Sequence, residues 1–188
     1  MPDSPSPSHI ETPAISDFFP AIELWADEDQ GTLEDLRDAL LSDLAPGTPY
    51  QHALANNLVE LEWDKLRHRR MRDALLRAEL RKNAMHLLSG EYGVFGPAPD
   101  SPEGETATDL VGSDPVRRKA AEEQLVESGS SLSELLAQAY QSVMPQMDHH
   151  ERQIAGVEIR RRKLRHDYDL LKSRQASPVE DAEIVQAP

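Results

Sequence analysis

Histidine and carboxylate side chains, which could together bind a metal ion, cluster at two places in the sequence. Residues 148–151 are Asp-His-His-Glu, and Asp64 precedes His68 by four positions. Metal sites on helices use ligands three or four residues apart, because those positions share one face. Four consecutive residues point in different directions, and the Asp64–His68 pair supplies only two ligands. We therefore predict no metal site and expect His150 to be a polar position in a helical seam.

Other chemistry is predicted to be absent as well. The chain has no Gly-x-Ser-x-Gly, no P-loop, no Gly-x-Gly-x-x-Gly and no His-Glu-x-x-His. It also has no cysteine, which excludes disulfides, thiolate metal sites and thiol catalysis. The sequence therefore predicts a protein that is not an enzyme and that needs no cofactor.

Two basic clusters could contact the phosphates of a polyanion. The residues proposed for that contact are Arg67, Arg69, Arg70, Arg160, Arg162 and Lys163. The favoured interpretation is that both clusters are solvated helix faces with acidic partners in the same chain, because bases at successive positions circle a helix. The net charge of −14 also disfavours binding along a nucleic acid. A nucleic acid therefore stays a possible but less favoured partner.

A dense apolar segment, residues 15–25, lies in the acidic arm at residues 1–30. The side chains predicted to contact a protein partner are Phe18, Phe19, Ile22 and Trp25. One interpretation is that this segment packs on the protein's own helices. The other is that it docks into the groove of a partner.

Helix-start patterns place the elements that must carry these residues. Thr32 with Asp35 resembles a capping box for a first helix, which Pro46-Gly47 should end. Thr48, Pro49 and Gln51 then predict a second helix that reaches Leu88 without an intervening Gly or Pro. Apolar residues on two sides of its first half predict two packing partners, the first helix and the last one.

Residues 90–113 are rich in Gly and Pro and are expected to form a flexible loop. A short helix should follow from Asp114-Pro115 to Ser128-Gly129. The last helix is expected to begin near Ser131 and to carry a heptad-like stripe, with Pro145 either kinking or splitting it. The stripe comprises Leu136, Tyr140, Val143, Met147, His150, Ile154, Val157, Arg161, Leu164, Tyr168 and Leu171.

A long stripe must bury itself against another helix, because isolated helices are marginal in water. We expect the two long helices to pair as an antiparallel hairpin, with residues 65–72 facing Asp148 and Glu151. Residues 160–165 would then lie near Glu60 and Glu62. The predicted core residues are Leu54, Leu58, Leu61, Ile154, Val157 and Leu164. The rival arrangement is a homodimer through the last helix.

Two stretches resemble a group of uncharacterised bacterial proteins. They are residues 33–78, LEDLRDALLSDLAPGTPYQHALANNLVELEWDKLRHRRMRDALLRA, and residues 149–171, HHERQIAGVEIRRRKLRHDYDLL. Many members of the group begin with a Thr-Pro-Glu-Gly-Lys-x-Arg motif, which this chain lacks. The resemblance implies an all-helical protein and brings no activity.

The sequence as a whole predicts an all-α fold, an elongated antiparallel helical hairpin or coiled-coil-like bundle with disordered acidic tails. Its expected parts are the arm at 1–30, a helical arm at 31–89, the loop at 90–113, helices at 114–175 and an acidic tail at 176–188. No run approaches the roughly 20 apolar residues that a membrane span needs, and residues 1–13 do not resemble a signal peptide. We predict a non-catalytic, cytoplasmic helical interaction or scaffold protein with an unidentified protein partner. The alternative is a nucleic-acid-associated accessory protein that uses the two basic clusters.

Overall fold

The computed structural model of the chain describes residues 21–90 and 100–176, and these residues are all-helical, with no strand among them. The helices in chain order are α1 (Gln30–Leu44), α2 (Pro49–Ser89), α3 (Pro102–Val111), α4 (Pro115–Glu127) and α5 (Leu132–Ala176). The chain divides into two compact units. Unit 1 comprises Met1–Trp63 and Ile159–Pro188, and unit 2 comprises Asp64–Glu158. The two long helices, α2 and α5, each contribute to both units.

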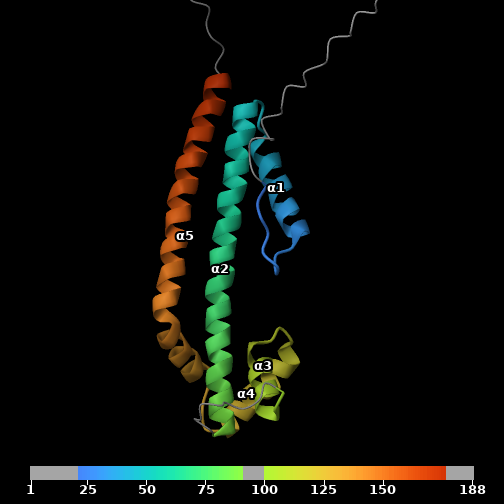
Figure 1. Cartoon of the computed structure of the whole chain (residues 1–188), viewed down its shortest axis with the longest axis vertical. Helices are drawn as coiled ribbons and strands as arrows, with labels where there is room; N and C mark the ends of the chain where they lie inside the picture. Colours follow the sequence, from blue (N-terminus) through green and yellow to red (C-terminus); the bar gives the residue numbers. More distant parts are fainter. Residues whose placement is uncertain (1–20, 91–99, 177–188) are drawn as a thin grey trace, which may run out of the picture. The chain divides into compact units, whose positions relative to one another are not determined.

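Unit 1 is held together by α1, residues 49–63 of α2 and residues 159–176 of α5. Its core takes Leu44 from α1, Leu54 and Leu58 from α2, and Tyr168 from α5. Trp63 is completely buried. The first half of α2 therefore has the two packing partners that its apolar sides predict, and α1 is one of them (Figure 1).

The helix ends in unit 1 show where cap prediction was right and where it was wrong. Thr32 is not the N-cap of α1: the helix begins three residues earlier, and the carboxylate of Asp29 accepts the Thr32 N–H at 2.7 Å. The predicted cap of α2 is confirmed, because the Thr48 hydroxyl accepts the Gln51 N–H at 3.2 Å. The Gln51 side chain reaches back to the Gly47 N–H at 2.7 Å.

Unit 2 packs the second part of α2 against α3, α4 and the first part of α5. The eight buried residues of its main core are Leu80, Ala84, Ala107, Leu110, Ala121, Leu125, Leu135 and Ala139. Half of them are alanines, whose short side chains allow helices to approach closely. This core brings all four helices of the unit together.

The interval 90–113 is not one flexible loop, because residues 102–111 form α3. Ser101 caps this helix by accepting the Gly104 N–H at 3.1 Å, and Pro102 occupies its first position. Acidic Glu103 and Glu105 lie in the first turn, where the helix dipole favours negative charge. The density of Gly and Pro hid a complete helix-start pattern.

The boundaries predicted for α4 and the start of α5 are confirmed. Asp114 caps α4, and Gly129 follows its end with φ of 84°, a conformation that favours glycine. At the start of α5, the Ser131 hydroxyl accepts the Glu134 N–H while the Glu134 carboxylate accepts the Ser131 N–H. This reciprocal pair is the predicted capping box.

The stripe predicted on α5 is confirmed from Val143 onward and wrong before it. From Val143 to Leu171 each member is buried or half-buried. Leu136 and Tyr140, however, are exposed, and Leu135 and Ala139 are buried in their place. Residues four apart, from Leu135 to Met147, stay on one face as α5 passes its neighbours in unit 2. The helix continues unbroken through Pro145, so of the two alternatives, a kink or a split, the split does not occur.

Within each unit, the segments of α2 and α5 run antiparallel. In unit 1, Gln51 pairs with Gln175 and Glu62 with Arg161. In unit 2, Lys65 pairs with Glu158 at 3.7 Å and Arg72 pairs with Glu151 at 2.7 Å.

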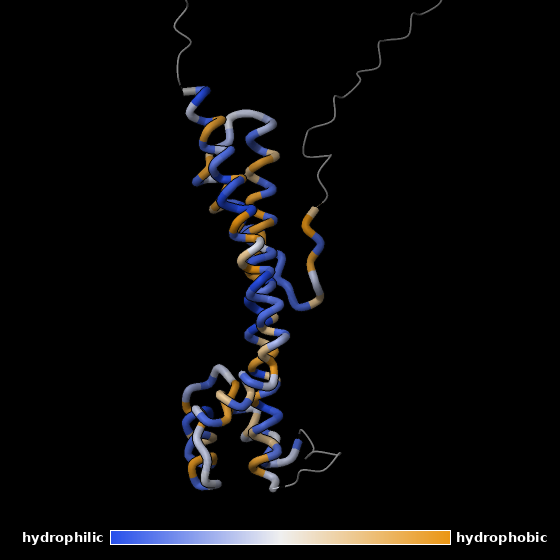
Figure 2. The backbone as a smooth tube through the Cα atoms, turned by 90° about the vertical axis from the view of Figure 1, so that its left-hand side faces the viewer, coloured by the Kyte–Doolittle hydropathy of each residue, from blue (hydrophilic) through white to orange (hydrophobic). Residues whose placement is uncertain are grey.

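Hydrophobic and hydrophilic residues alternate along both long helices (Figure 2). Among the described residues, none of the helices combines the length and apolar content that crossing a bilayer requires.

Candidate functional site

An open pocket in unit 2 lies where its four helices meet. Its volume is about 620 Å³, within the range of small-molecule sites. The apolar part of its wall comes from α2, α3 and α5 and comprises Leu80, Leu110, Val111, Leu132 and Leu136. The polar part comprises Gly112, Ser113 and two arginines, Arg77 and Arg118. We call this the arginine-lined pocket.

The charges at the arginine-lined pocket are all of one sign. None of its lining residues is acidic, although the chain as a whole has 34 acidic and 20 basic residues. Arg118 donates a hydrogen bond to the Gly112 carbonyl oxygen, which fixes its guanidinium at the wall. Arg77 is exposed and makes no ion pair or hydrogen bond with any residue in 21–90 or 100–176. Its guanidinium therefore has donors available for an anion.

The turn between α3 and α4 shapes one wall of this pocket. The Gly112 N–H donates to the Asp109 carbonyl at 3.1 Å and ends α3. A Cβ at Gly112 would lie 3.3 Å from that oxygen, so glycine allows this close approach. Two residues later the Asp114 carboxylate accepts the Val116 N–H at 2.9 Å and starts α4. The backbone of the turn is thus fixed at both ends, and it places Ser113 and Arg118 at the pocket.

A second surface runs along the outside of α5 in unit 2. Leu136, Tyr140 and Met144 are 41%, 47% and 46% exposed and follow one another at intervals of four residues, on one helix face. A shallow groove of about 420 Å³ lies beside them, lined by Ser133, Leu136, Ala137, Tyr140 and Gln141. We call Leu136, Tyr140 and Met144 the α5 stripe. No residue from 135 to 147 carries a charge.

A histidine pair joins α2 and α5 in unit 2. The Nδ1 atoms of His68 and His150 are 3.1 Å apart, so one ring donates its hydrogen and the other accepts it. Burial lowers the pKa of His150, and the positive charges that His68 and His149 acquire on protonation lower it further. Within the described residues, no group of three or more His, Asp or Glu side chains is arranged to hold a metal ion. The pair therefore links α2 and α5 by a hydrogen bond.

The residues predicted to contact a protein partner are only partly described. Phe18 and Phe19 lie outside the described residues. Ile22 is half-buried, and Trp25 is 49% exposed at a turn in which its backbone N–H donates to the Glu28 carboxylate. The docking role of this segment stays a prediction.

The predicted polyanion residues fall in different units. Arg67, Arg69 and Arg70 belong to unit 2, and Arg160, Arg162 and Lys163 belong to unit 1. Arg67 is half-buried and lies 3.5 Å from the Asp64 carboxylate, while the other five are exposed.

Neighbours of these residues pair with acids of the same chain, as the favoured interpretation expects. Arg72 pairs with Glu151, and Arg161 pairs with Glu62 at 3.2 Å.

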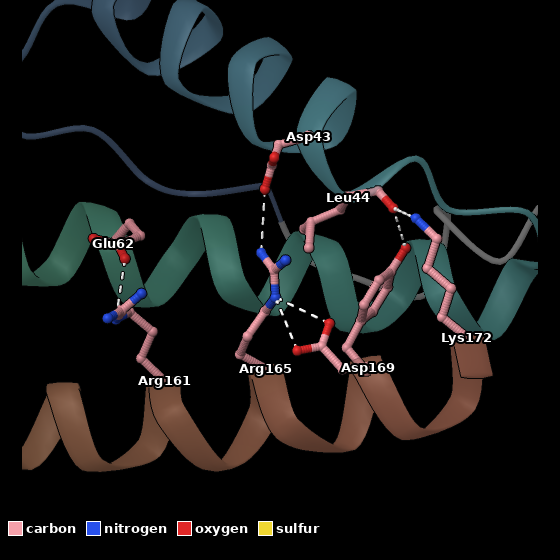
Figure 3. A network of polar contacts seen from close by, with 8 residues as sticks. Asp43, Leu44, Glu62, Arg161, Arg165, Asp169 and Lys172 are labelled. Atoms are coloured by element: carbon pink, nitrogen blue, oxygen red, sulfur yellow. Dashed lines mark hydrogen bonds and ion pairs between the residues drawn. The ribbon is translucent and has the colours of Figure 1, made fainter. Parts of the chain in front are cut away.

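In unit 1, Arg165 also pairs with acidic residues of the same chain, within a polar network between α1 and α5 (Figure 3). Arg165 pairs with Asp43 at 3.2 Å and with Asp169 at 3.1 Å. The Leu44 carbonyl, at the end of α1, accepts the Tyr168 hydroxyl at 2.9 Å and the Lys172 ammonium at 2.7 Å. These bonds satisfy a carbonyl that a helix end leaves without a partner. The arrangement ties α1 to α5.

No family model, no curated protein and no solved structure matches this chain in comparisons with known proteins. The resemblance to the group of bacterial helical proteins therefore stays a prediction.

Sequence reasoning missed both the arginine-lined pocket and the α5 stripe. Leu136 and Tyr140 were assigned to a buried seam, although the absence of charge at 135–147 was visible in the sequence and marks an unusual face. Arg77 and Arg118 are ordinary basic residues in sequence. Only the fold of α3, which was predicted to be loop, brings them to one pocket.

Proposed function

We propose that this chain is a non-catalytic helical interaction protein and that a second copy of the chain docks on the α5 stripe. The observation that carries this proposal is the exposure of three large apolar side chains on one face of a helix. Contiguous exposed apolar patches are uncommon on monomeric proteins and mark interaction sites. The groove beside Tyr140 provides a recess in which a side chain of the second copy can lie.

Charge favours a second copy over a different partner. Each copy carries a net charge of −14, so most of its surface repels another copy. The α5 stripe lies in the uncharged interval 135–147. Two copies can therefore meet there without placing like charges opposite each other, whereas a partner selected by its charge would gain nothing at this face.

The stripe is also compatible with two-fold symmetry. In an antiparallel pair of α5 helices with the axis at Tyr140, Leu136 of one copy faces Met144 of the other. Each residue then contacts its counterpart reciprocally, as an isologous interface requires. Ala137 beside the stripe is small and allows the two helices to approach closely. Because the patch is short, we expect a dimer of micromolar rather than nanomolar affinity.

The test is sedimentation of the full chain over a range of protein concentrations. The unchanged chain should shift from monomer to dimer at micromolar concentrations, and added salt should favour the dimer by screening the net charge. Tyr140→Glu should stay monomeric, because it places two carboxylates together at the axis. The matched control is Val126→Glu, which adds the same charge at an exposed residue of α4 and should dimerise normally.

Circular dichroism checks that both variants keep their helix content. A chain that stays monomeric at high concentration contradicts the proposal, and so does a Tyr140→Glu variant that still dimerises.

The alternative is polyanion binding, and one observation favours it. Arg160, Arg162 and Lys163 are exposed on a single stretch of α5 in unit 1. Such a function requires that the chain bind a labelled duplex at low salt and lose affinity steeply as salt rises. Absence of binding at low salt removes this alternative, and the dimer proposal does not depend on the result.

A further inference from the structure

The arginine-lined pocket combines an apolar floor with a rim of one charge. Leu80 and Leu110 at its wall are themselves core residues, 7% and 3% exposed. The floor is therefore part of the packed structure of unit 2, which fixes its position. Apolar walls with a few placed polar groups are the usual composition of small-molecule sites.

We propose that this pocket binds a small carboxylate with an apolar chain. The apolar chain would lie on Leu80, Leu110 and Leu132, and the carboxylate would lie between Arg77 and Arg118 (the lining residues are those of the 620 Å³ pocket). A guanidinium presents several N–H donors in a fork that matches a carboxylate. The Ser113 hydroxyl at the same wall provides one more donor.

The number of guanidinium donors that are not already engaged determines how much negative charge the pocket can accept. Arg118 already donates one N–H to the Gly112 carbonyl, so part of its hydrogen-bonding capacity is used. Arg77 has no ion pair among the described residues. One available guanidinium and part of a second suit a single negative charge, and the apolar walls exclude a ligand that is polar throughout.

The wall of the pocket contains no acidic side chain that would repel a carboxylate. No Asp or Glu lines it, so an incoming carboxylate meets no like charge within the wall. A cation would face two guanidinium groups and would be repelled. An uncharged apolar molecule would gain the contacts of the floor but would leave Arg77 without an anion.

The experiment is a titration of the full-length protein with octanoate and, in parallel, with 1-octanol, followed by amide chemical shifts. We expect octanoate to shift the amides of Leu80, Leu110 and Ser113 in a saturable way. 1-Octanol, which has the same chain without the charge, should bind about tenfold more weakly, as expected for the loss of a charge-assisted hydrogen bond. Arg77→Gln should weaken octanoate by about the same factor and leave 1-octanol unchanged.

The matched control is Arg81→Gln, which removes the same charge from an exposed residue one helical turn away on α2 and is expected to leave octanoate binding unchanged. Arg77 is exposed, so its replacement is not expected to unfold the unit, and the amide spectrum of each variant verifies this. Three results would each overturn the proposal. They are octanoate shifts outside the pocket or none at all, equal binding of octanoate and 1-octanol, and equal losses in the Arg77 and Arg81 variants.

Discussion

The cores of the two units of this protein are built from side chains of different size. Unit 1 buries large ones, with Trp63 and Tyr168 at 0% and 1% exposure, and closes its core with hydrogen bonds to the Leu44 carbonyl. Unit 2 fills half of its main core with alanine. Its helices approach closely, and larger apolar residues such as Leu136 and Tyr140 remain outside.

This difference explains why both candidate surfaces lie in unit 2. A core of small residues leaves the large side chains of α5 on the surface and leaves an open pocket where four helices converge. Unit 1 also leaves large apolar side chains exposed, among them Tyr50, Ile159 and Leu170, but they do not follow one another at intervals of four residues as the α5 stripe does. Replacing a large core residue by a small one should therefore destabilise unit 1, and replacing a small core residue by a large one should destabilise unit 2.

The largest expected effect is in unit 1, at Tyr168. Tyr168→Ala removes a buried ring and a hydrogen bond, and should lower the free energy of unfolding by about 3–5 kcal/mol. Urea denaturation followed by tryptophan fluorescence is the measurement, because both tryptophans of the chain, Trp25 and Trp63, belong to unit 1. Tyr140→Ala, at an exposed tyrosine of unit 2, should change the fluorescence midpoint little. Equal effects at the two tyrosines would contradict the comparison.

The opposite exchange should break unit 2. Ala139 is fully buried, and Ala139→Leu adds volume where helix backbones already approach closely. We expect a loss of about 1–3 kcal/mol from overpacking, measured by urea denaturation with circular dichroism. Ala155→Leu, at an exposed position of the same helix in unit 2, is the control. If Ala139→Leu is neutral, the core of unit 2 is looser than we describe.

Removing a helix cap should lower the free energy of unfolding by a similar amount in both units, because a cap is a local interaction. Thr48→Ala removes the hydroxyl that accepts the Gln51 N–H in unit 1, and Ser131→Ala removes the one that accepts the Glu134 N–H in unit 2. Each should cost about 1 kcal/mol in the free energy of unfolding. A much larger loss in one unit would show that its caps, and not its core, carry the difference.

The smallest expected effect is on pH dependence in unit 2. The pKa of His150 is lowered in the folded protein by burial, by His68 and by His149, so the unfolded chain binds a proton at higher pH than the folded chain does. Stability should therefore be complete above the ordinary histidine pKa of about 6.5 and should fall as pH drops below it. His150→Asn should flatten urea midpoints measured from pH 8 to 5. An unchanged slope in His150→Asn would contradict this prediction.

Much of the fold could be predicted because helix ends depend on local chemistry. The Thr48, Asp114 and Ser131 starts were identified correctly, since a cap involves only residues three positions apart. The error at α1 arose because both Asp29 and Thr32 have the side chain of an N-cap. Local patterns alone do not rank two such candidates three residues apart.

The register of α5 and the pocket could not be predicted in the same way. A periodic stripe shows that a face is buried but not where a helix changes partner, so Leu136 and Tyr140 were assigned to the wrong face. The pocket depends on α3, whose Ser101-Pro102 start lies among glycines and prolines that are typical of a loop.

The connectivity of the two units has a consequence for the order in which a ribosome could allow them to fold. Unit 2 is one uninterrupted stretch, Asp64–Glu158, whereas unit 1 joins segments from either side of it. The core that contains Leu54 and Leu58 of α2 is complete only after Tyr168 has been synthesised. A nascent chain should therefore expose Leu54 and Leu58 for as long as it takes to translate the whole of unit 2.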